Sequence, residues 1–457
     1  MRKRLLFFSF LITLSCLAGL VVYQLPPVQE QLSWRLDSLR TQVRYFFNPP
    51  DQAVFVPQAG TGSTALPIPP TPQSSAALPS SAALPSWAAL PSSPIQMASP
   101  TPDLVSPTPT PSLPGPTATP TLTPTPTLAQ TSLPTSVYLT GIRFDWQSFN
   151  NCGPANLAMA LSYWGWSGDQ RHTRDYLRPH PDDYNVMPEE MLAFVETQTE
   201  LKALLRAGGD IDLLKRLLAA GFPVIIEMGH HPSDDWWMGH YLVISGYDDG
   251  WERFITQDSL VMADFPVPYE DVAERWWRDF NYLYLVIYPP ERQDELYALL
   301  GNHAGPEYAW QHALQLASQE VQVLQGRDLF FAWYNKGGSL VALGQYAAAA
   351  EAYDQAFAIY QDLPDKERPW RVGWYQTGPY QAYYHTGRYQ DVINLADTTL
   401  GVFAKPPLEE SLYWRARARQ ATGDLDGAIA DYKLAVDLNL TFAYGQVELE
   451  GLGVIYP

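Results

Sequence analysis

The fold of this chain is decided by residues 146–157, which read Trp146-Gln147-Ser148-Phe149-Asn150-Asn151-Cys152-Gly153-Pro154-Ala155-Asn156-Leu157. Apolar residues continue to Trp164 at the spacing of a helix. Proline in a first helical turn is a start signal, because its missing N–H would have no intrahelical partner there. We therefore expect Cys152 at a helix N-terminus, where free N–H groups and the helix dipole favour a thiolate.

Cys152 has no evident disulfide partner in the chain. The 457 residues contain 2 cysteines, and the other, Cys16, lies inside an apolar N-terminal run. A single thiol at a helix start is typical of a reactive cysteine. The alternative is a buried cysteine that packs as a small apolar residue.

The first residues predict a membrane anchor. Arg2-Lys3-Arg4 precede Leu5–Tyr23, an uncharged run of nineteen residues that just spans a hydrocarbon core of roughly 30 Å. We expect residues 1–24 to form an uncleaved signal-anchor transmembrane helix, although Leu17-Ala18-Gly19 leaves cleavage open. The basic flank stays in the cytoplasm, so the remainder is expected to be extracytoplasmic at the cell membrane.

Two further segments precede the first globular domain. Residues 25–56 form a juxtamembrane amphipathic segment, expected to lie on the membrane surface or to pair with another copy, a plain helix being the alternative. Residues 57–135 are rich in Pro, Ser and Thr with Asp103 as their only charge, which predicts a disordered linker. In polyproline II conformation it would hold the next domain on the order of 100–200 Å from the membrane.

Residues 136–292 predict a mixed α+β domain, because helices come first and β-rich runs follow. Helices are expected from Cys152, after Pro188, and over 210–218, where Gly221 ends the last. Strands are expected over 223–227, 240–245, 253–256 and 281–287. Asp248-Asp249-Gly250 predicts a hairpin turn between the second and third strands.

Residues 300–457 predict an all-α domain of tetratricopeptide repeats. One unit has Trp333, Gly337, Leu340, Gly344, Tyr346, Ala349, Tyr353 and Ala356 at the expected spacing, and another has Leu412, Ala416, Gly423, Ala428, Tyr432 and Ala435. A weaker unit lies between them at Tyr380, Tyr383, Gly387 and Ala396, after an insertion near 364–369. Pro306–Gly326 is expected to add a helix that joins the two domains.

A nucleophilic cysteine needs a base, a group that orients the base, and donors for the developing oxyanion. Of the downstream histidines (His172, His180, His230, His231 and His240), His240 begins the strongest strand, where a rigid sheet can hold its ring. Asp258 ends the opposite arm of the hairpin, which predicts that it lies near His240. Asp248 and Asp249 compete for the orienting role but are better explained as turn residues.

Other interpretations of these residues stay open. His230, His231 and His240 with Asp234 and Asp235 are a candidate metal cluster, although no second pair at fixed spacing supports it. Trp236 and Trp237 either line a substrate cleft or pack in the core. Gln147 and Asp258 are alternatively a satisfied loop amide and a strand-end residue.

Three blocks resemble the bacteriocin-processing (double-glycine leader) cysteine peptidases and their papain-like relatives: Gln147-x3-Asn151-Cys152-Gly-Pro-Ala, Gly239-His240-Tyr-Leu-Val-Ile-Ser-Gly-Tyr-Asp, and Gln257-Asp258. The resemblance covers roughly residues 138–290. It implies Cys152 as nucleophile, His240 as general base and acid, Asp258 as orienter and Gln147 as oxyanion donor. The leader peptidases usually carry Asp where this chain has Asn151, and they precede a transporter, so double-glycine specificity is not carried over.

The expected function is a membrane-tethered extracytoplasmic cysteine peptidase that hydrolyses peptide or protein substrates, with tetratricopeptide repeats that bind a protein partner. The formal net charge of −19 argues against nucleic acid as a partner. No cofactor or metal is implied. The alternatives are a catalytically silent peptide-binding scaffold, and a cell-wall amide hydrolase or acyltransferase that uses the same Cys–His pair.

Overall fold

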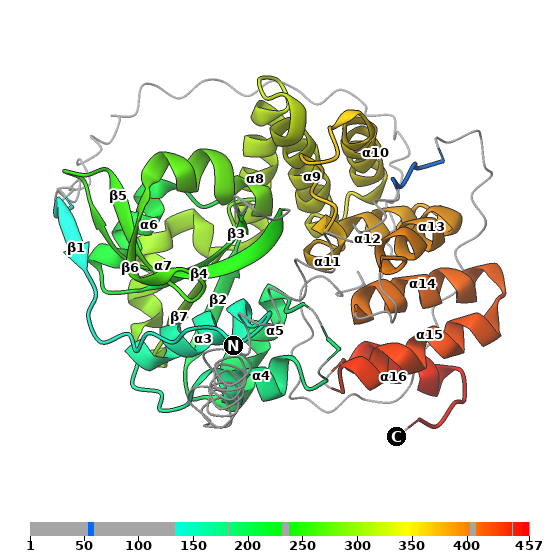
Figure 1. Ribbon diagram of the computed structural model, residues 1–457, viewed down its shortest axis with the longest axis horizontal. Helices are drawn as coiled ribbons and strands as arrows, with labels where there is room; N and C mark the ends of the chain where they lie inside the picture. Colours follow the sequence, from blue (N-terminus) through cyan, green and yellow to red (C-terminus); the bar gives the residue numbers. More distant parts are fainter. Residues whose placement is uncertain are drawn as a thin grey trace, which may run out of the picture.

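The computed structural model describes residues 54–58, 133–180, 182–183, 185–230, 237–402, 408–440 and 442–456. The predicted signal-anchor at 1–24 and most of the two segments after it lie outside these residues. Within the described ranges no helix combines the length and the apolar character needed to cross a membrane. The described chain forms an α+β domain beside a C-terminal helical region, residues 306–456 (Figure 1).

The α+β domain is built on an antiparallel sheet, in which six strands follow the order β2-β7-β3-β4-β5-β6 and β1 pairs with β4. The strands are β1 (Ser136–Tyr138), β2 (Lys202–Arg206), β3 (Val224–His230), β4 (Met238–Asp248), β5 (Arg253–Asp258), β6 (Met262–Pro268) and β7 (Tyr284–Tyr288). The four predicted strands form as β3, β4, β5 and β7. The others were not predicted, because they are short or carry too few β-branched residues to stand out.

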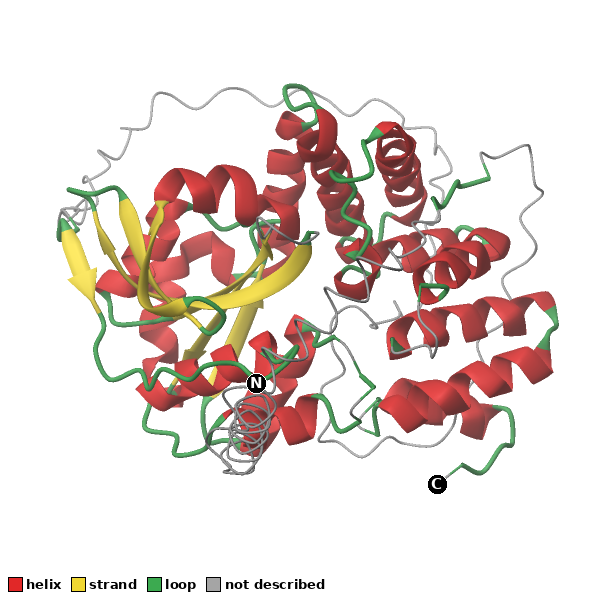
Figure 2. Cartoon of the chain, in the orientation of Figure 1, coloured by secondary structure: helices red, strands yellow, loops and turns green. Residues whose placement is uncertain are grey.

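Helices cover both faces of this sheet (Figure 2). They are α3 (Cys152–Tyr163), α4 (Gln170–Leu177) and α5 (Pro188–Gln198) on one face, with α6 (Ile211–Ala219) and α7 (Gln293–Leu300) on the other. Ile225 packs toward α3 and α5, while its neighbours Val224 and Ile226 pack toward α6. Alternate residues of a strand point to opposite faces, so a sheet buried on both sides reads as a continuous apolar run.

The three predicted helices of this domain begin as the sequence indicates. Cys152 is the first residue of α3, and Pro188 is the first residue of α5. The side chain of Asp210 accepts a hydrogen bond from the backbone N–H of Leu213 and so caps α6. Short 3-10 or π turns follow at η2 (Asp271–Trp276), η3 (Arg278–Phe280), η4 (Pro290–Arg292) and η5 (Gly301–Ala304).

The C-terminal helical region is a stack of helix pairs. Its helices are α8 (Pro306–Glu320), α9 (Gly326–Ala342), α10 (Tyr346–Asp362), α11 (Val372–Tyr375), α12 (Gly378–His385), α13 (Tyr389–Leu400), α14 (Glu409–Thr422), α15 (Leu425–Leu438) and α16 (Ala443–Gly451). Gly344, Gly387 and Gly423, the glycines expected to mark the repeats, stand at the turns of three pairs with φ of +71°, +74° and +92°. Glycine adopts this left-handed conformation without a Cβ clash.

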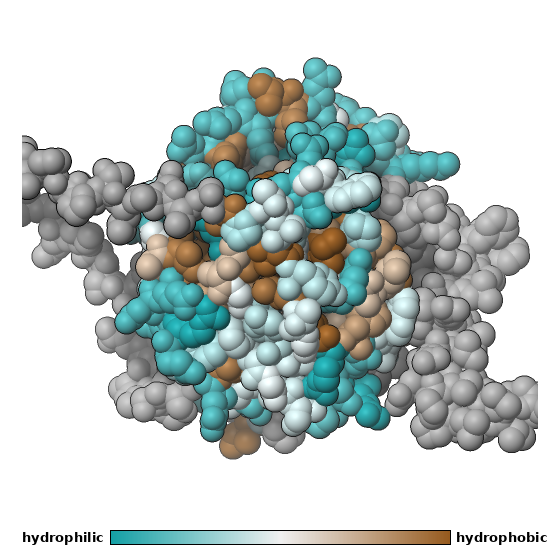
Figure 3. Space-filling view, turned by 90° about the vertical axis from the view of Figure 1, so that its left-hand side faces the viewer, coloured by the Kyte–Doolittle hydropathy of each residue, from teal (hydrophilic) through white to brown (hydrophobic). Residues whose placement is uncertain are grey.

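The helical region contacts the α+β domain first at η3. Asn335 of α9 donates its side-chain amide to the carbonyl of Arg278 over 2.7 Å, and Gln376 donates to the carbonyl of Asp279 over 2.8 Å. A buried polar group is costly when it lacks a hydrogen-bond partner, and another orientation of the two parts would break these bonds. They therefore favour this one orientation. The opposite end of the domain, which carries β1, shows apolar side chains near its centre surrounded by polar ones (Figure 3).

A second contact joins the start of α5 to α14 and α15. Asn185 donates its amide to Oε2 of Glu410 over 3.0 Å, and Asn439 donates to Oε1 of Glu190 over 2.9 Å. Asn185, Glu410 and Asn439 are each 3% exposed or less. The helical region is therefore docked on the α+β domain at two places rather than linked to it by α8 alone.

Candidate active site

Cys152 has a half-buried, free thiol at the start of α3. The groups that act on this thiol are the side chain of His240 and the backbone N–H groups of Gly153 and Tyr241. Burial alone would raise the pKa of the Cys152 thiol. The hydrogen bond and charge of His240, together with the two N–H groups, outweigh burial and lower that pKa. The environment of Cys152 therefore favours a thiolate.

His240 and Asp258 form a buried pair on neighbouring strands. His240 Nε2 lies 2.9 Å from Asp258 Oδ1, and each residue is 2% exposed. Burial would lower the pKa of His240, but the charge and hydrogen bond of Asp258, and then Cys152, raise it to about 10. The imidazole therefore lies between Cys152 and Asp258, and its protonated form is the stable one.

Asp258 is held by the backbone as well as by His240. Its Oδ1 accepts from the N–H groups of Leu260, at 2.9 Å, and Val261, at 3.2 Å. Burial would raise the pKa of Asp258. The charge and hydrogen bond of His240, together with the hydrogen bond from the Leu260 N–H, outweigh burial and lower that pKa. The turn after β5 thus fixes the ionised carboxylate in one position.

The two competing aspartates lie in the β4–β5 turn. Asp248 Oδ1 accepts from the N–H of Gly250 at 2.8 Å, and Asp249 forms an ion pair with Lys215 at 2.7 Å. Both carboxylates therefore have partners at the turn. Asp248 accepts from the turn backbone, as aspartates in turns commonly do.

Gln147 reaches the site through a hydrogen-bond chain that the sequence did not reveal. Asn156 Nδ2 donates to Ser259 Oγ over 2.9 Å, and Ser259 Oγ in turn donates to Gln147 Oε1 over 2.9 Å. Since the Ser259 hydrogen goes to Gln147, the Gln147 carbonyl oxygen faces Ser259 and its amide NH2 faces the other way. Asn156 and Ser259 are both fully buried. This chain sets which end of the Gln147 amide is available as a donor.

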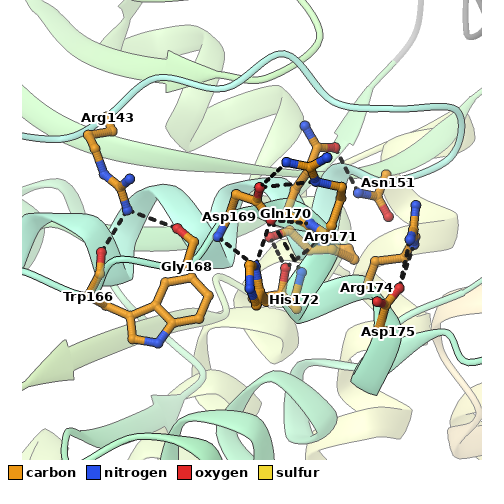
Figure 4. Close-up of polar contacts among 12 residues, drawn as sticks. Arg143, Asn151, Trp166, Gly168, Asp169, Gln170, Arg171, His172, Arg174 and Asp175 are labelled. Carbon is orange, nitrogen blue, oxygen red and sulfur yellow. Dashed lines mark hydrogen bonds and ion pairs between the residues drawn. The ribbon is translucent and has the colours of Figure 1, made fainter. Parts of the chain in front are cut away.

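The loop between Gln147 and Cys152 is clamped by Gln170, the first residue of α4. Gln170 Oε1 accepts from Asn151 Nδ2 and from the N–H of Ser148, both at 2.8 Å, and its Nε2 donates to the carbonyl of Trp146 at 2.7 Å. Figure 4 shows Gln170 facing Asn151 beside the start of α3. Asn151, where the leader peptidases usually carry Asp, is therefore a neutral partner of Gln170.

Three of the other candidate histidines have definite places. His180 Nδ1 accepts from the backbone N–H of Asp182 over 3.1 Å. His172 pairs with Asp169 at 2.7 Å, and its side chain is exposed on α4 (Figure 4). His230 lies beside His240, with 5.6 Å between ring centroids. Among the described residues no group of three or more His, Cys, Asp or Glu side chains is arranged to hold a metal ion. His231, Asp234 and Asp235 lie outside the described residues.

Trp237 packs in the core rather than facing a substrate. It is 1% exposed, and its Nε1 donates to Asp279 Oδ2 over 2.8 Å. Its ring lies 6.0 Å from that of Tyr375, at the end of α11 in the helical region. The Tyr375 ring lies against the backbone of Gly239, one residue before His240, so a Cβ built at Gly239 would stand 2.9 Å from Tyr375 Cδ1. The helical region therefore reaches the residues next to the catalytic histidine candidate.

Two families of known proteins match parts of this chain. Residues 126–283 match the model of the Peptidase_C39 like family, and residues 332–363 and 409–442 match the tetratricopeptide repeat model. The α+β domain therefore matches the C39-like peptidases, as predicted. The repeat matches confirm the first and third predicted units. No curated protein matches the chain.

Solved structures of low identity also match. One is described as a C39-like peptidase from Bacillus anthracis, at 20% identity over 33% of this chain and 96% of that one, with a TM-score of 0.28. Another is Xylellain, a cysteine protease from Xylella fastidiosa, at 18% identity over 34% of this chain and 87% of that one, with a TM-score of 0.24.

Proposed function

We propose that the chain is a membrane-tethered extracytoplasmic peptidase that hydrolyses peptide bonds through a triad of Cys152, His240 and Asp258. The observation that carries this proposal is the 2.9 Å contact between His240 Nε2 and Asp258 Oδ1, with the same imidazole lowering the pKa of the Cys152 thiol. A base held between a nucleophile and an orienting acid is the arrangement that acyl transfer needs.

The proposed reaction begins with a thiolate and an imidazolium. The Cys152 sulfur attacks the peptide carbonyl carbon, and the negative oxygen that forms accepts hydrogen bonds from Gln147 Nε2 and the Cys152 N–H. The second donor belongs to the first turn of α3, where N–H groups lack an intrahelical acceptor. His240 then protonates the leaving amine as the C–N bond breaks.

The second half of the reaction regenerates the enzyme. His240, now neutral, takes a proton from water, and the resulting hydroxide attacks the thioester carbonyl. The C–S bond breaks, the carboxylic acid product leaves, and Cys152 and His240 return to the ion pair. Asp258 keeps the imidazole in position and stabilises its charge at both stages.

The proposed location rests on the N-terminal sequence. Arg2-Lys3-Arg4 followed by the apolar run Leu5–Tyr23 supports a single span with its basic end in the cytoplasm. The C-terminal helical region is proposed to bind a protein partner, because its repeats match a family of interaction modules. Tyr375 of that region lies against Gly239, so the region contacts the residue that precedes His240.

The test is alkylation of Cys152 by iodoacetamide across pH, in the full-length chain, read by mass spectrometry. We expect the reaction to saturate well below about pH 8.5, the pKa of a free thiol, and to lose this profile in His240→Ala. Casein hydrolysis measured in parallel should disappear in Cys152→Ala with folding retained. An ordinary thiol profile, or hydrolysis that survives Cys152→Ala, would contradict the proposal.

A further inference from the structure

Residues 54–58 pack against the C-terminal helical region, although the two are far apart in the sequence. The backbone N–H of Gln58 donates to Asp391 Oδ1 over 2.9 Å, across a sequence separation of 333 residues. Figure 1 shows this short segment, in blue, beside α10 and α13. The segment was expected to belong to the membrane-proximal part of the chain, yet it contacts the most distant domain.

One side chain of the segment is buried there. Phe55 is 5% exposed, and its ring meets that of Phe357 edge-on at 4.9 Å and that of Tyr383 at 6.1 Å. The next residue, Val56, is 56% exposed. This alternation is that of an extended segment with one face on the helices. We name its site the Phe55 pocket, whose walls include Phe357 and Tyr383. Phe55 in turn lines an adjoining cavity together with Tyr334, Tyr360, Tyr380 and Leu395.

The polar anchor beside the pocket is built within the helical region itself. Asp391 is 3% exposed, and its Oδ2 accepts from Arg388 Nε at 2.7 Å. Arg388 also bonds to both carboxylate oxygens of Asp354. This network holds Asp391 so that Oδ1 receives a backbone N–H from outside. Because every residue except proline offers that N–H, the anchor recognises an extended backbone, and the pocket recognises an aromatic side chain three residues earlier.

We propose that Val54–Gln58 is an intramolecular ligand of the Phe55 pocket, and that a protein partner with an extended aromatic-containing segment binds there by displacing it. The inference rests on the proposed partner-binding role of the helical region. Five residues with one buried ring form a small contact, which would be weak between separate molecules. Tethering raises the effective concentration to about millimolar, which is enough to keep the segment bound and still allow competition.

Docking would also change the reach of the tether. With residues 54–58 bound to the helical region, only residues 25–53 separate the predicted membrane span from the folded body. With the segment released, residues 25–132 do so. Displacement by a partner would therefore free the peptidase domain to act further from the membrane.

The test uses the full-length chain with Cys152→Ala, so that no peptide is cleaved, and a fluorescein-labelled peptide of residues 51–60 read by anisotropy. Phe55→Ala removes the buried ring, whereas Val56→Ala changes the exposed neighbour and is the matched control. We expect the Phe55→Ala chain to bind the peptide at least about tenfold more tightly than the chain with the unchanged segment or the Val56→Ala chain. The factor corresponds to the burial of one phenylalanine, which the tethered segment loses in Phe55→Ala.

Equal affinities in the three chains, or no binding by Phe55→Ala, would overturn the proposal. Sedimentation is measured on the same samples. A dimer that becomes a monomer in Phe55→Ala would show that the segment docks on a second copy, which overturns the intramolecular form. Peptidase activity is measured separately in chains that keep Cys152, so its absence would contradict the proposed enzyme without affecting this comparison.

Discussion

The backbone of Gly239 lies directly against the ring of Tyr375, so the helical region touches the strand residue that precedes His240. A Cβ built at Gly239 would stand 2.9 Å from Tyr375 Cδ1 and 2.9 Å from Phe280 Cζ. Real Cβ atoms do not approach other atoms this closely, and something has to shift. The position of His240 therefore depends on how the two parts of the chain are docked.

Gly239→Ala is predicted to lower kcat/KM by on the order of tenfold to a hundredfold, because a small displacement of His240 misaligns it with Cys152. Adding Tyr375→Ala should restore part of the activity by opening space for the new methyl group. Gly305→Ala is the control, since the nearest atom to its Cβ is 3.6 Å away. If Gly239→Ala is fully active, the contact does not position His240.

The pH dependence follows from the shifted pKa values of the pair. The Cys152 pKa is lowered and the His240 pKa is raised to about 10, so the thiolate–imidazolium pair exists between those two values. We expect hydrolysis to fall as pH rises through about 10, where the imidazolium loses its proton, and to fall again in acid as the thiolate is protonated.

Asp258→Asn is predicted to lower the His240 pKa, because Asp258 makes the largest contribution that raises it. The alkaline limit of the activity profile should therefore move toward neutral pH. The rate should fall by about 10²–10⁴-fold, since the imidazolium loses its charge partner. The measurement is kcat/KM across pH for both chains. An unchanged alkaline limit would mean that Asp258 does not control His240.

Local sequence signals were enough to predict that Cys152 begins a helix and that His240 and Asp258 lie together. Pro154 marks the start of α3, and the hairpin at Asp248-Asp249-Gly250 brings β4 and β5 together, so that Asp258 comes near His240. Each of these signals lies within a few residues of the feature that it predicts.

The supporting contacts could not be predicted because they join distant parts of the chain. Asn156 looks like any polar residue of a helix until Ser259 is brought against it from a turn 103 residues away. Asn185 meets Glu410 across 225 residues, and nothing near either residue indicates this. Such pairs depend on how the domains dock, which has no local pattern.

Ser259→Ala is predicted to reduce kcat by about tenfold with little change in KM. Its hydroxyl donates to Gln147 Oε1 and so fixes the amide, and in the proposed mechanism a rotated amide would present its oxygen to the oxyanion in place of its NH2. Ser259→Thr keeps the hydroxyl and should retain most activity. The alkylation profile of Cys152 should be the same in both variants, because Gln147 acts on the oxyanion rather than on the thiol. A parallel loss of thiol activation would point to general damage at the site.

Buried carboxylates gather where α5 meets α14. Asp183, Glu190, Glu409 and Glu410 have raised pKa values, in each case chiefly because burial disfavours the charged form, with mutual repulsion adding to this in most of them. An acid whose folded pKa lies above its unfolded value stabilises the fold below the unfolded pKa, about 4.3 for glutamate. That stabilisation is lost as pH rises through the folded pKa. The contact between the two parts of the chain should therefore weaken as the solution becomes alkaline.

Glu409→Gln is predicted to raise the melting temperature at pH 8 by on the order of 2–4 °C, because it removes a charge that the folded state disfavours. The glutamine keeps an Oε1 acceptor for Asn439, which donates to Glu409 over 2.9 Å. The gain should be smaller at pH 5, because the raised pKa of Glu409 leaves less of the native carboxylate ionised as pH falls. The exposed Glu450→Gln serves as the control and should change the melting temperature at neither pH. Calorimetry at the two pH values decides the matter, and a gain of equal size at both would mean that the glutamine acts through packing rather than through charge.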